Sequence, residues 1–205
     1  MNLANKLTII RVILVPIFVI VGYLGTCGII HGEFLAIPVY FWIMNIVFII
    51  AAITDKLDGY IARSRNQVTT FGKFLDPLAD KILVLSALIM LVEFGKIPAW
   101  IPIIVLTREF LVSGYRLIAV EKGGQVIAAS IWGKLKTVTQ MIAIILVFID
   151  QYNFFDFING AQFNNTLCLV LNATSSILML ISVVATIFSG WDYLKNGKDL
   201  FKESV

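Results

Sequence analysis

Long apolar runs separated by short polar links make up most of this sequence. Residues 34–54 and 157–191 each contain no charged side chain. A helix needs about 20 apolar residues to cross the hydrocarbon layer, and these runs lack the strict alternation of a membrane-barrel strand. The pattern predicts six spanning helices, over residues 9–28, 34–63, 72–92, 98–119, 130–149 and 166–190. The expected fold class is an all-α integral membrane protein with six transmembrane helices.

Composition supports a lipid environment. Of the 205 residues, 59% are hydrophobic and 14% are charged, whereas soluble domains carry about 25% charged residues. No linker rich in Ser, Gly or Pro divides the chain, so we expect one domain over residues 1–205. The net charge of +3 comes without a basic stripe interleaved with aromatic residues. We therefore expect membrane lipids as partners and no nucleic acid.

The placement of charges predicts the orientation. Charged clusters fall at the start of the first span, the end of the second and the start of the third, and this alternation continues to the sixth. Alternating helices then bring every cluster to one membrane face, and of the 16 Lys and Arg only Lys96 lies in a link on the other side. Because cytoplasmic loops carry the excess of Lys and Arg, we expect a multi-pass protein of the plasma membrane. We expect the polar site to lie in the cytoplasmic half of the helices, with both termini and the site facing the cytoplasm.

Histidine and cysteine restrict the chemistry. The only histidine, His31, lies in an outer link away from the charged clusters, which excludes His-based zinc sites and His-based acid–base catalysis. Cys27 and Cys168 both lie near the outer ends of their spans. A disulfide between them is conceivable, but we expect two buried, unpaired thiols.

Four aspartates in two neighbouring spans are the strongest chemical pattern. At 100° per residue, Asp55 and Asp58 lie about 60° apart on one helix face, and Asp76 and Asp80 about 40° apart on the next. Eight residues, 64–71, join the two helices as an antiparallel pair. All four carboxylates can therefore converge at the cytoplasmic end.

These carboxylates have two interpretations. They could cap helices or pair with Lys56, Arg63 and Lys81. However, an aspartate at the centre of a spanning helix costs about 2.5–3.5 kcal/mol, and clustered carboxylates repel one another unless cations lie among them. A set of oxygen donors without Cys or His suits Mg²⁺ or Mn²⁺. We therefore predict a site for two divalent metal ions.

Small residues flank the aspartates. Gly59, Ala62 and Gly72 present no bulk, so a base or a diphosphate could approach the backbone closely. The same residues also suit close packing of helices, and both roles can hold. Two metals beside a cleft of small residues form an arrangement used to displace diphosphates.

The full pattern, D-x2-D-G-x2-A-R-x8-G-x3-D-x3-D, resembles the signature of the CDP-alcohol phosphatidyltransferases. Its eight fixed positions are Asp55, Asp58, Gly59, Ala62, Arg63, Gly72, Asp76 and Asp80. The resemblance implies six spans, with an active site that opens to the cytoplasm. It also implies that the four aspartates hold the metals, with Asp80 as the general base for the attacking alcohol. The residues implied to contact CDP-diacylglycerol are Asp58, Gly59, Ala62, Arg63 and Gly72.

Three shorter segments resemble the members of that family whose acceptor is glycerol 3-phosphate. They cover residues 5–11, residues 107–109 and residues 132–137. The implied reaction transfers the phosphatidyl group of CDP-diacylglycerol to glycerol 3-phosphate and releases CMP. The expected assembly is a homodimer.

The predicted acceptor site is basic. Candidates for binding the acceptor phosphate are Thr8, Arg11, Arg116, Lys134 and Lys136. The alternative is that these cations only anchor the helices, with side chains that snorkel to the interface.

Other functions stay open from sequence alone. The same chemistry could use inositol phosphate, serine or phosphatidylglycerol as the acceptor. A divalent-cation transporter is disfavoured, because no ionisable path reaches the other leaflet. An inactive membrane scaffold would leave the four aspartates unexplained.

Overall fold

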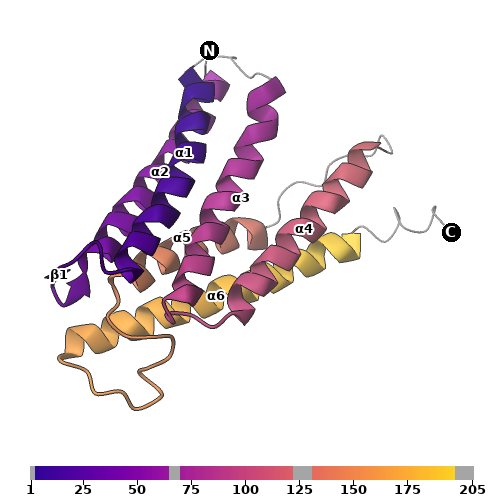
Figure 1. The fold of residues 1–205 in the computed structure, drawn as a ribbon. Helices are drawn as coiled ribbons and strands as arrows, with labels where there is room; N and C mark the ends of the chain where they lie inside the picture. The colour runs from indigo at the N-terminus through magenta and orange to yellow at the C-terminus, as the bar shows by residue number, and fades with distance from the viewer. Residues whose placement is uncertain (1–2, 65–69, 122–130, 197–205) are drawn as a thin grey trace.

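The computed structural model describes residues 3–64, 70–121 and 131–196, and these ranges are almost entirely helical (Figure 1). The helices are α1 (Leu3–Thr26), α2 (Val39–Ser64), α3 (Thr70–Glu93), α4 (Trp100–Glu121), α5 (Ile131–Ile149) and α6 (Thr166–Asn196). Helices α1, α2 and α3 run side by side, and α4 lies along α6 (Figure 1). The structure therefore confirms the prediction that the protein is mainly helical.

One predicted helix begins later than expected. The apolar run from residue 34 was assigned to the second span, but α2 starts at Val39. Before it, β1 (Glu33–Phe34) and β2 (Ile37–Pro38) form a short antiparallel hairpin. Leu35 and Ala36 occupy its turn with φ of 56° and 58°, the left-handed conformation of a two-residue hairpin turn. Turn geometry and Pro38 thus override the hydrophobic pattern here.

One predicted helix ends later than expected. The sixth span was assigned to residues 166–190, but α6 continues to Asn196. Tyr193 lies in this extension, is 4% exposed, and packs edge-on against Tyr115 of α4 with ring centroids 6.1 Å apart. Packing against α4 supports the helix beyond its apolar run.

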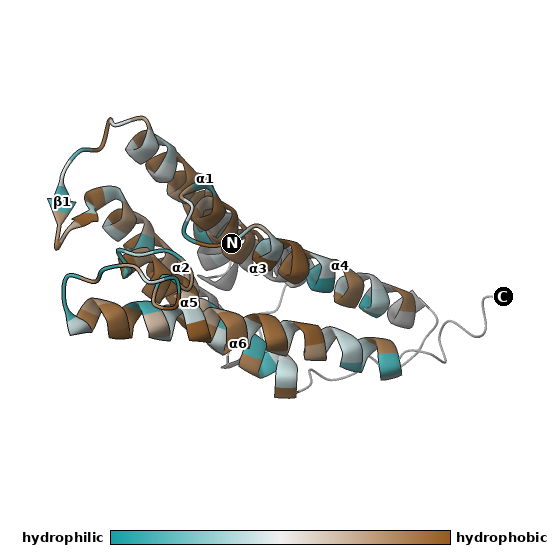
Figure 2. Cartoon of the chain, turned by 90° about the horizontal axis from the view of Figure 1, so that it is seen from below, coloured by the Kyte–Doolittle hydropathy of each residue, from teal (hydrophilic) through white to brown (hydrophobic). Residues whose placement is uncertain are grey.

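Three helical segments in the described part of the chain are long and apolar enough to cross a membrane. They are Thr8–Thr26, Ile131–Ile149 and Thr166–Lys195, and Val39–Thr54 is a shorter apolar helix. Large apolar side chains such as Phe110, Ile131 and Leu167 are exposed, and hydrophobic residues, coloured brown, make up much of the helical ribbons in Figure 2. Exposed apolar surface on this scale indicates contact with lipid. The protein is a helical membrane protein, and the count of six spans stays a prediction.

An aromatic and aliphatic core fills the space between the helices. Phe18, Met44, Phe48 and Phe148 are fully buried there. Helices α1 and α2 approach closely at Gly25, where an added Cβ would overlap the ring of Tyr40. The core thus fixes α1 and α2 together, and α2 carries the first two aspartates of the motif.

A second polar cluster lies at the end of the fold opposite the aspartate motif. Lys96, in the α3–α4 link, donates from Nζ to the carbonyl oxygens of Asp150 (2.8 Å) and Tyr152 (3.3 Å). The Asp150 carboxylate accepts hydrogen bonds from Asn172 Nδ2 (2.9 Å) and Ser175 Oγ (2.7 Å). Burial lowers the pKa of Lys96 below its ordinary value, and nearby carboxylates partly offset this effect. These bonds join the α3–α4 link to α5 and α6, so this end has a structural role.

The two cysteines are unpaired, as predicted. The prediction that both are buried is wrong, because Cys27 is exposed and Cys168 is partly exposed. Cys27 follows the last residue of α1, where the core no longer covers the chain.

Candidate active site

The aspartate motif occupies the facing ends of α2 and α3. Asp55 and Asp58 fall within α2, and Asp76 and Asp80 within α3, on helices that pack against each other. The side chains of residues 55–78 and of Asp80 lie outside the described part of the structure. Hence the predicted roles of these four aspartates, and of Gly59, Ala62, Arg63 and Gly72, are not tested by side-chain geometry.

The backbone register of α2 leads from the core to the motif. The buried residues Phe41, Met44, Phe48 and Ala51 recur at alternating steps of three and four residues. The same steps continue to positions 55, 58 and 62, and such a repeat keeps positions on one side of a helix. Positions 55 and 58 therefore belong to the side of α2 that the bundle core also uses.

The register of α3 gives the same result. Leu83, Ala87 and Leu91 are fully buried, and stepping back by three or four residues leads to positions 80 and 76. Within the described side chains, no group of three or more His, Cys, Asp or Glu is placed to hold a metal ion. The aspartate motif stays the predicted metal centre.

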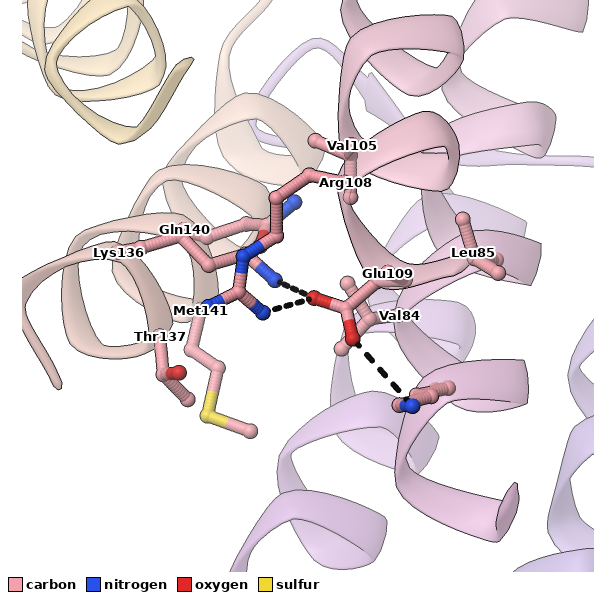
Figure 3. A pocket seen from close by; sticks show the side chains of 10 residues that line it. Val84, Leu85, Val105, Arg108, Glu109, Lys136, Thr137, Gln140 and Met141 are labelled. Atoms are coloured by element: carbon pink, nitrogen blue, oxygen red, sulfur yellow. Dashed lines mark hydrogen bonds and ion pairs between the residues drawn. The ribbon is translucent and has the colours of Figure 1, made fainter. Parts of the chain in front are cut away.

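A polar pocket follows the motif directly on α3. Lys81 lines it together with Arg108 and Glu109 of α4 and Lys136 of α5, as Figure 3 shows for the labelled residues. Its volume is about 110 Å³, and Val84, Leu85, Val105 and Met141 supply apolar wall. Three helices thus bring four charged side chains together, and one of them, Lys81, directly follows Asp80 in the sequence.

The Glu109 carboxylate is the centre of this cluster. Oε1 accepts a hydrogen bond from Arg108 at 3.0 Å and pairs with Lys136 Nζ, and Oε2 lies 3.7 Å from Lys81 Nζ (Figure 3). The Glu109 side chain is 13% exposed. Among the described side chains, three cations surround one carboxylate. Cations in a pocket from which water is partly excluded can attract an anion.

Further contacts fix two of the cations. Arg108 donates from its second terminal nitrogen to Ser189 Oγ, and its guanidinium carbon lies 5.7 Å from the Tyr193 ring centroid. Lys81 Nζ donates to Ser113 Oγ, which in turn donates to the Glu109 carbonyl oxygen at 2.6 Å. Hydrogen bonds on several sides hold both side chains at the pocket, which reduces the entropy lost when an anion binds.

The structure brings only one of the predicted acceptor residues into this pocket. Lys136 lines the pocket and is 7% exposed. Lys134 is exposed, because two residues along a helix amount to about 200° of rotation. Arg116 is also exposed, and it donates to Tyr193 Oη at 2.8 Å. Thr8 and Arg11 are buried in α1, and neither lines the pocket.

Sequence reasoning missed four pocket residues as site members. Lys81 was considered only as a charge that marks orientation or pairs with the aspartates, Arg108 and Glu109 only as evidence for orientation or subgroup, and Gln140 was not singled out. One available signal was the spacing of Lys136 and Gln140, which are four residues apart and therefore share a face of α5. The other was that a charged side chain within a spanning helix needs a partner of opposite charge. This requirement applies to Lys81, Arg108 and Glu109.

Comparison with known proteins gives a consistent result. The model of the CDP-alcohol phosphatidyltransferase family matches residues 1–188. The chain is 40% identical to the CDP-diacylglycerol–glycerol-3-phosphate 3-phosphatidyltransferase of Bacillus subtilis, over 99% of this chain and 98% of that relative. It is 36% identical to the Haemophilus influenzae protein of the same name, over 100% of this chain and 97% of that relative. A probable phosphatidylglycerophosphate synthase of Mycobacterium tuberculosis is 36% identical over 94% of this chain and 80% of that relative.

Proposed function

This chain belongs to the CDP-alcohol phosphatidyltransferase family, and we propose that it transfers the phosphatidyl group of CDP-diacylglycerol to glycerol 3-phosphate. The products are phosphatidylglycerophosphate and CMP. Family membership makes the protein a transferase of phospholipid synthesis. The observation that carries the choice of acceptor is the cationic pocket of Lys81, Arg108 and Lys136, which follows Asp80 on α3.

The motif fits the metal dependence of the family. CDP-alcohol phosphatidyltransferases generally depend on divalent metal ions. Four carboxylates without a thiol or imidazole are the donors that Mg²⁺ and Mn²⁺ prefer. We propose that Asp55, Asp58, Asp76 and Asp80 hold two such ions. When bound, the ions neutralise the diphosphate of the lipid donor and stabilise the charge that develops on CMP.

The chain itself performs three tasks in the transfer. The Asp80 carboxylate accepts the proton of the attacking acceptor hydroxyl, whose oxygen forms the new bond to phosphorus as the bond to the CMP oxygen breaks. Gly59, Ala62 and Gly72 leave room for the donor headgroup beside the backbone, and Arg63 adds positive charge. The acceptor phosphate lies in the cationic pocket.

Charge decides between anionic and neutral acceptors. A phosphomonoester carries nearly two negative charges at neutral pH and must approach a donor diphosphate that is also anionic. The cations Lys81, Arg108 and Lys136 offset this repulsion, with the lysines acting as point charges. Serine has no phosphate to contact these cations.

The direct test is turnover with a panel of acceptors. Purified protein in detergent or vesicles receives CDP-diacylglycerol, Mg²⁺ and one acceptor at a time, and CMP release is measured. We expect glycerol 3-phosphate to support turnover and glycerol, serine and inositol to support little. Inositol phosphate tests whether any phosphomonoester suffices. Turnover with free serine but not with glycerol 3-phosphate would refute the proposed function.

We also propose that the active site faces the cytoplasm of the cell that makes the protein. The proposal rests on the one-sided charge pattern, and it places the 150–165 loop outside. In a variant whose Cys27 and Cys168 are changed to Ser, Asn66→Cys and Gly124→Cys should resist an impermeant thiol reagent in intact cells. Asn159→Cys, at an exposed loop position, should be labelled. The reverse pattern would contradict this orientation, and the expected homodimer stays a prediction of its own.

A further inference from the structure

Gln140 is a buried polar residue without an obvious structural purpose. It lies on α5, is 2% exposed, and lines the cationic pocket (Figure 3). Its amide nitrogen Nε2 is buried and has no hydrogen-bond partner among the residues that the structure describes. An unpaired buried donor costs about 1–3 kcal/mol, whereas an apolar residue here would avoid the cost. A ligand oxygen at this position would satisfy the amide.

A second donor in the same pocket is also unpaired. Arg108 lines the pocket, and its Nε is buried without a hydrogen-bond partner. Its two terminal nitrogens already donate to Glu109 and Ser189. Two residues with an unsatisfied N–H group, one on α4 and one on α5, therefore line one cavity of about 110 Å³. Such a cavity has room for a small polar group, because a water molecule occupies about 30 Å³ in the liquid.

The pocket contains both charged and neutral polar groups. Gln140 lies one helical turn beyond Lys136 on α5, a rise of about 6 Å. Lys81, Arg108 and Lys136 supply positive charge, and Gln140 supplies a neutral amide. A ligand that matches these groups carries an anionic group and, a few bonds away, an uncharged oxygen.

We propose that the Gln140 amide donates a hydrogen bond to the secondary hydroxyl of the glycerol phosphate acceptor and so determines acceptor specificity. This inference rests on the proposed function. The three cations already satisfy the phosphate, so a neutral amide is better matched to a neutral hydroxyl, which can both donate and accept. A site built to bond a hydroxyl also disfavours analogues that lack it, because the amide then stays unpaired.

The test is a cycle that changes one partner at a time. The acceptors are glycerol 3-phosphate and 3-hydroxypropyl phosphate, which lacks only the secondary hydroxyl. The proteins are the wild type and Gln140→Met, which keeps the side-chain volume close and removes the amide. We expect wild-type kcat/KM to fall about tenfold when the hydroxyl is absent, and Gln140→Met to lose about tenfold with glycerol 3-phosphate. The variant should then hardly distinguish the two acceptors.

A matched control separates this role from a structural one. Thr139→Val changes the residue next to Gln140. The Thr139 hydroxyl donates within α5 to the Leu135 carbonyl oxygen at 2.8 Å, and Thr139 does not line the pocket. Thr139→Val should keep the wild-type preference for glycerol 3-phosphate, and the KM for CDP-diacylglycerol should stay unchanged in both variants. Equal losses with both acceptors in Gln140→Met, or no loss at all, would overturn the inference. If the wild type does not use glycerol 3-phosphate, the proposed function fails instead.

Discussion

Asp58→Asn should abolish CMP release while the protein stays folded. Asparagine has nearly the same size, but it removes the negative charge with which a divalent cation is held. Metal ions contribute several kcal/mol of charge stabilisation to phosphoryl transfer, so turnover should fall by about a thousandfold or more. We expect the same result for Asp55, Asp76 and Asp80. The measurement is CMP release with saturating CDP-diacylglycerol and glycerol 3-phosphate.

Thermal unfolding supplies a second measurement that does not depend on activity. Mg²⁺ should raise the unfolding temperature of the wild type, because a ligand that binds only the folded state stabilises it. In Asp58→Asn this increase should be small, and without metal the variant should be as stable as the wild type or more so, since one repelling charge is gone. Asp192→Asn, on α6 outside the motif, is the matched control and should respond to Mg²⁺ normally. Wild-type turnover that survives exhaustive chelation would refute the metal site.

Lys136→Met should raise the KM for glycerol 3-phosphate by about tenfold or more and change the KM for CDP-diacylglycerol much less. Hydrogen bonds to charged groups contribute about 1.5–3 kcal/mol, which corresponds to this range. The fold should tolerate the change, because Glu109 keeps Arg108 and Lys81 as partners. The measurement is steady-state kinetics in which each substrate is varied in turn.

Lys134→Met is the informative comparison for this prediction. Lys134 lies two residues away on the same helix, has the same charge, and is exposed. The structure predicts a smaller effect at Lys134 than at Lys136, whereas the sequence alone assigned both to the acceptor site. Equal effects of the two variants on the KM for glycerol 3-phosphate would contradict the pocket. Equal effects of Lys136→Met on both substrates would return this lysine to an anchoring role.

Much of the fold could be predicted from the sequence because helix formation follows a local pattern. The third and fifth helices begin and end within two residues of the predicted bounds. The first helix begins at Leu3 rather than at residue 9, and two other errors occurred where a non-local factor acts. The hairpin before Val39 depends on two left-handed residues and a proline, and the end of α6 depends on Tyr193 packing against Tyr115.

The sequence by itself determined the chemistry of this protein. Four aspartates at fixed spacing, in a chain too apolar for water, predicted a divalent-metal site in a membrane protein, and the resemblance implied phosphatidyl transfer, with which the family comparison agrees. The tertiary structure decided which cations line one pocket. Lys134 and Lys136 are the same type of residue and lie two positions apart, but they lie on different sides of α5. Whether that side faces Glu109 depends on how α4 and α5 are rotated and offset against each other, and core packing sets that rotation.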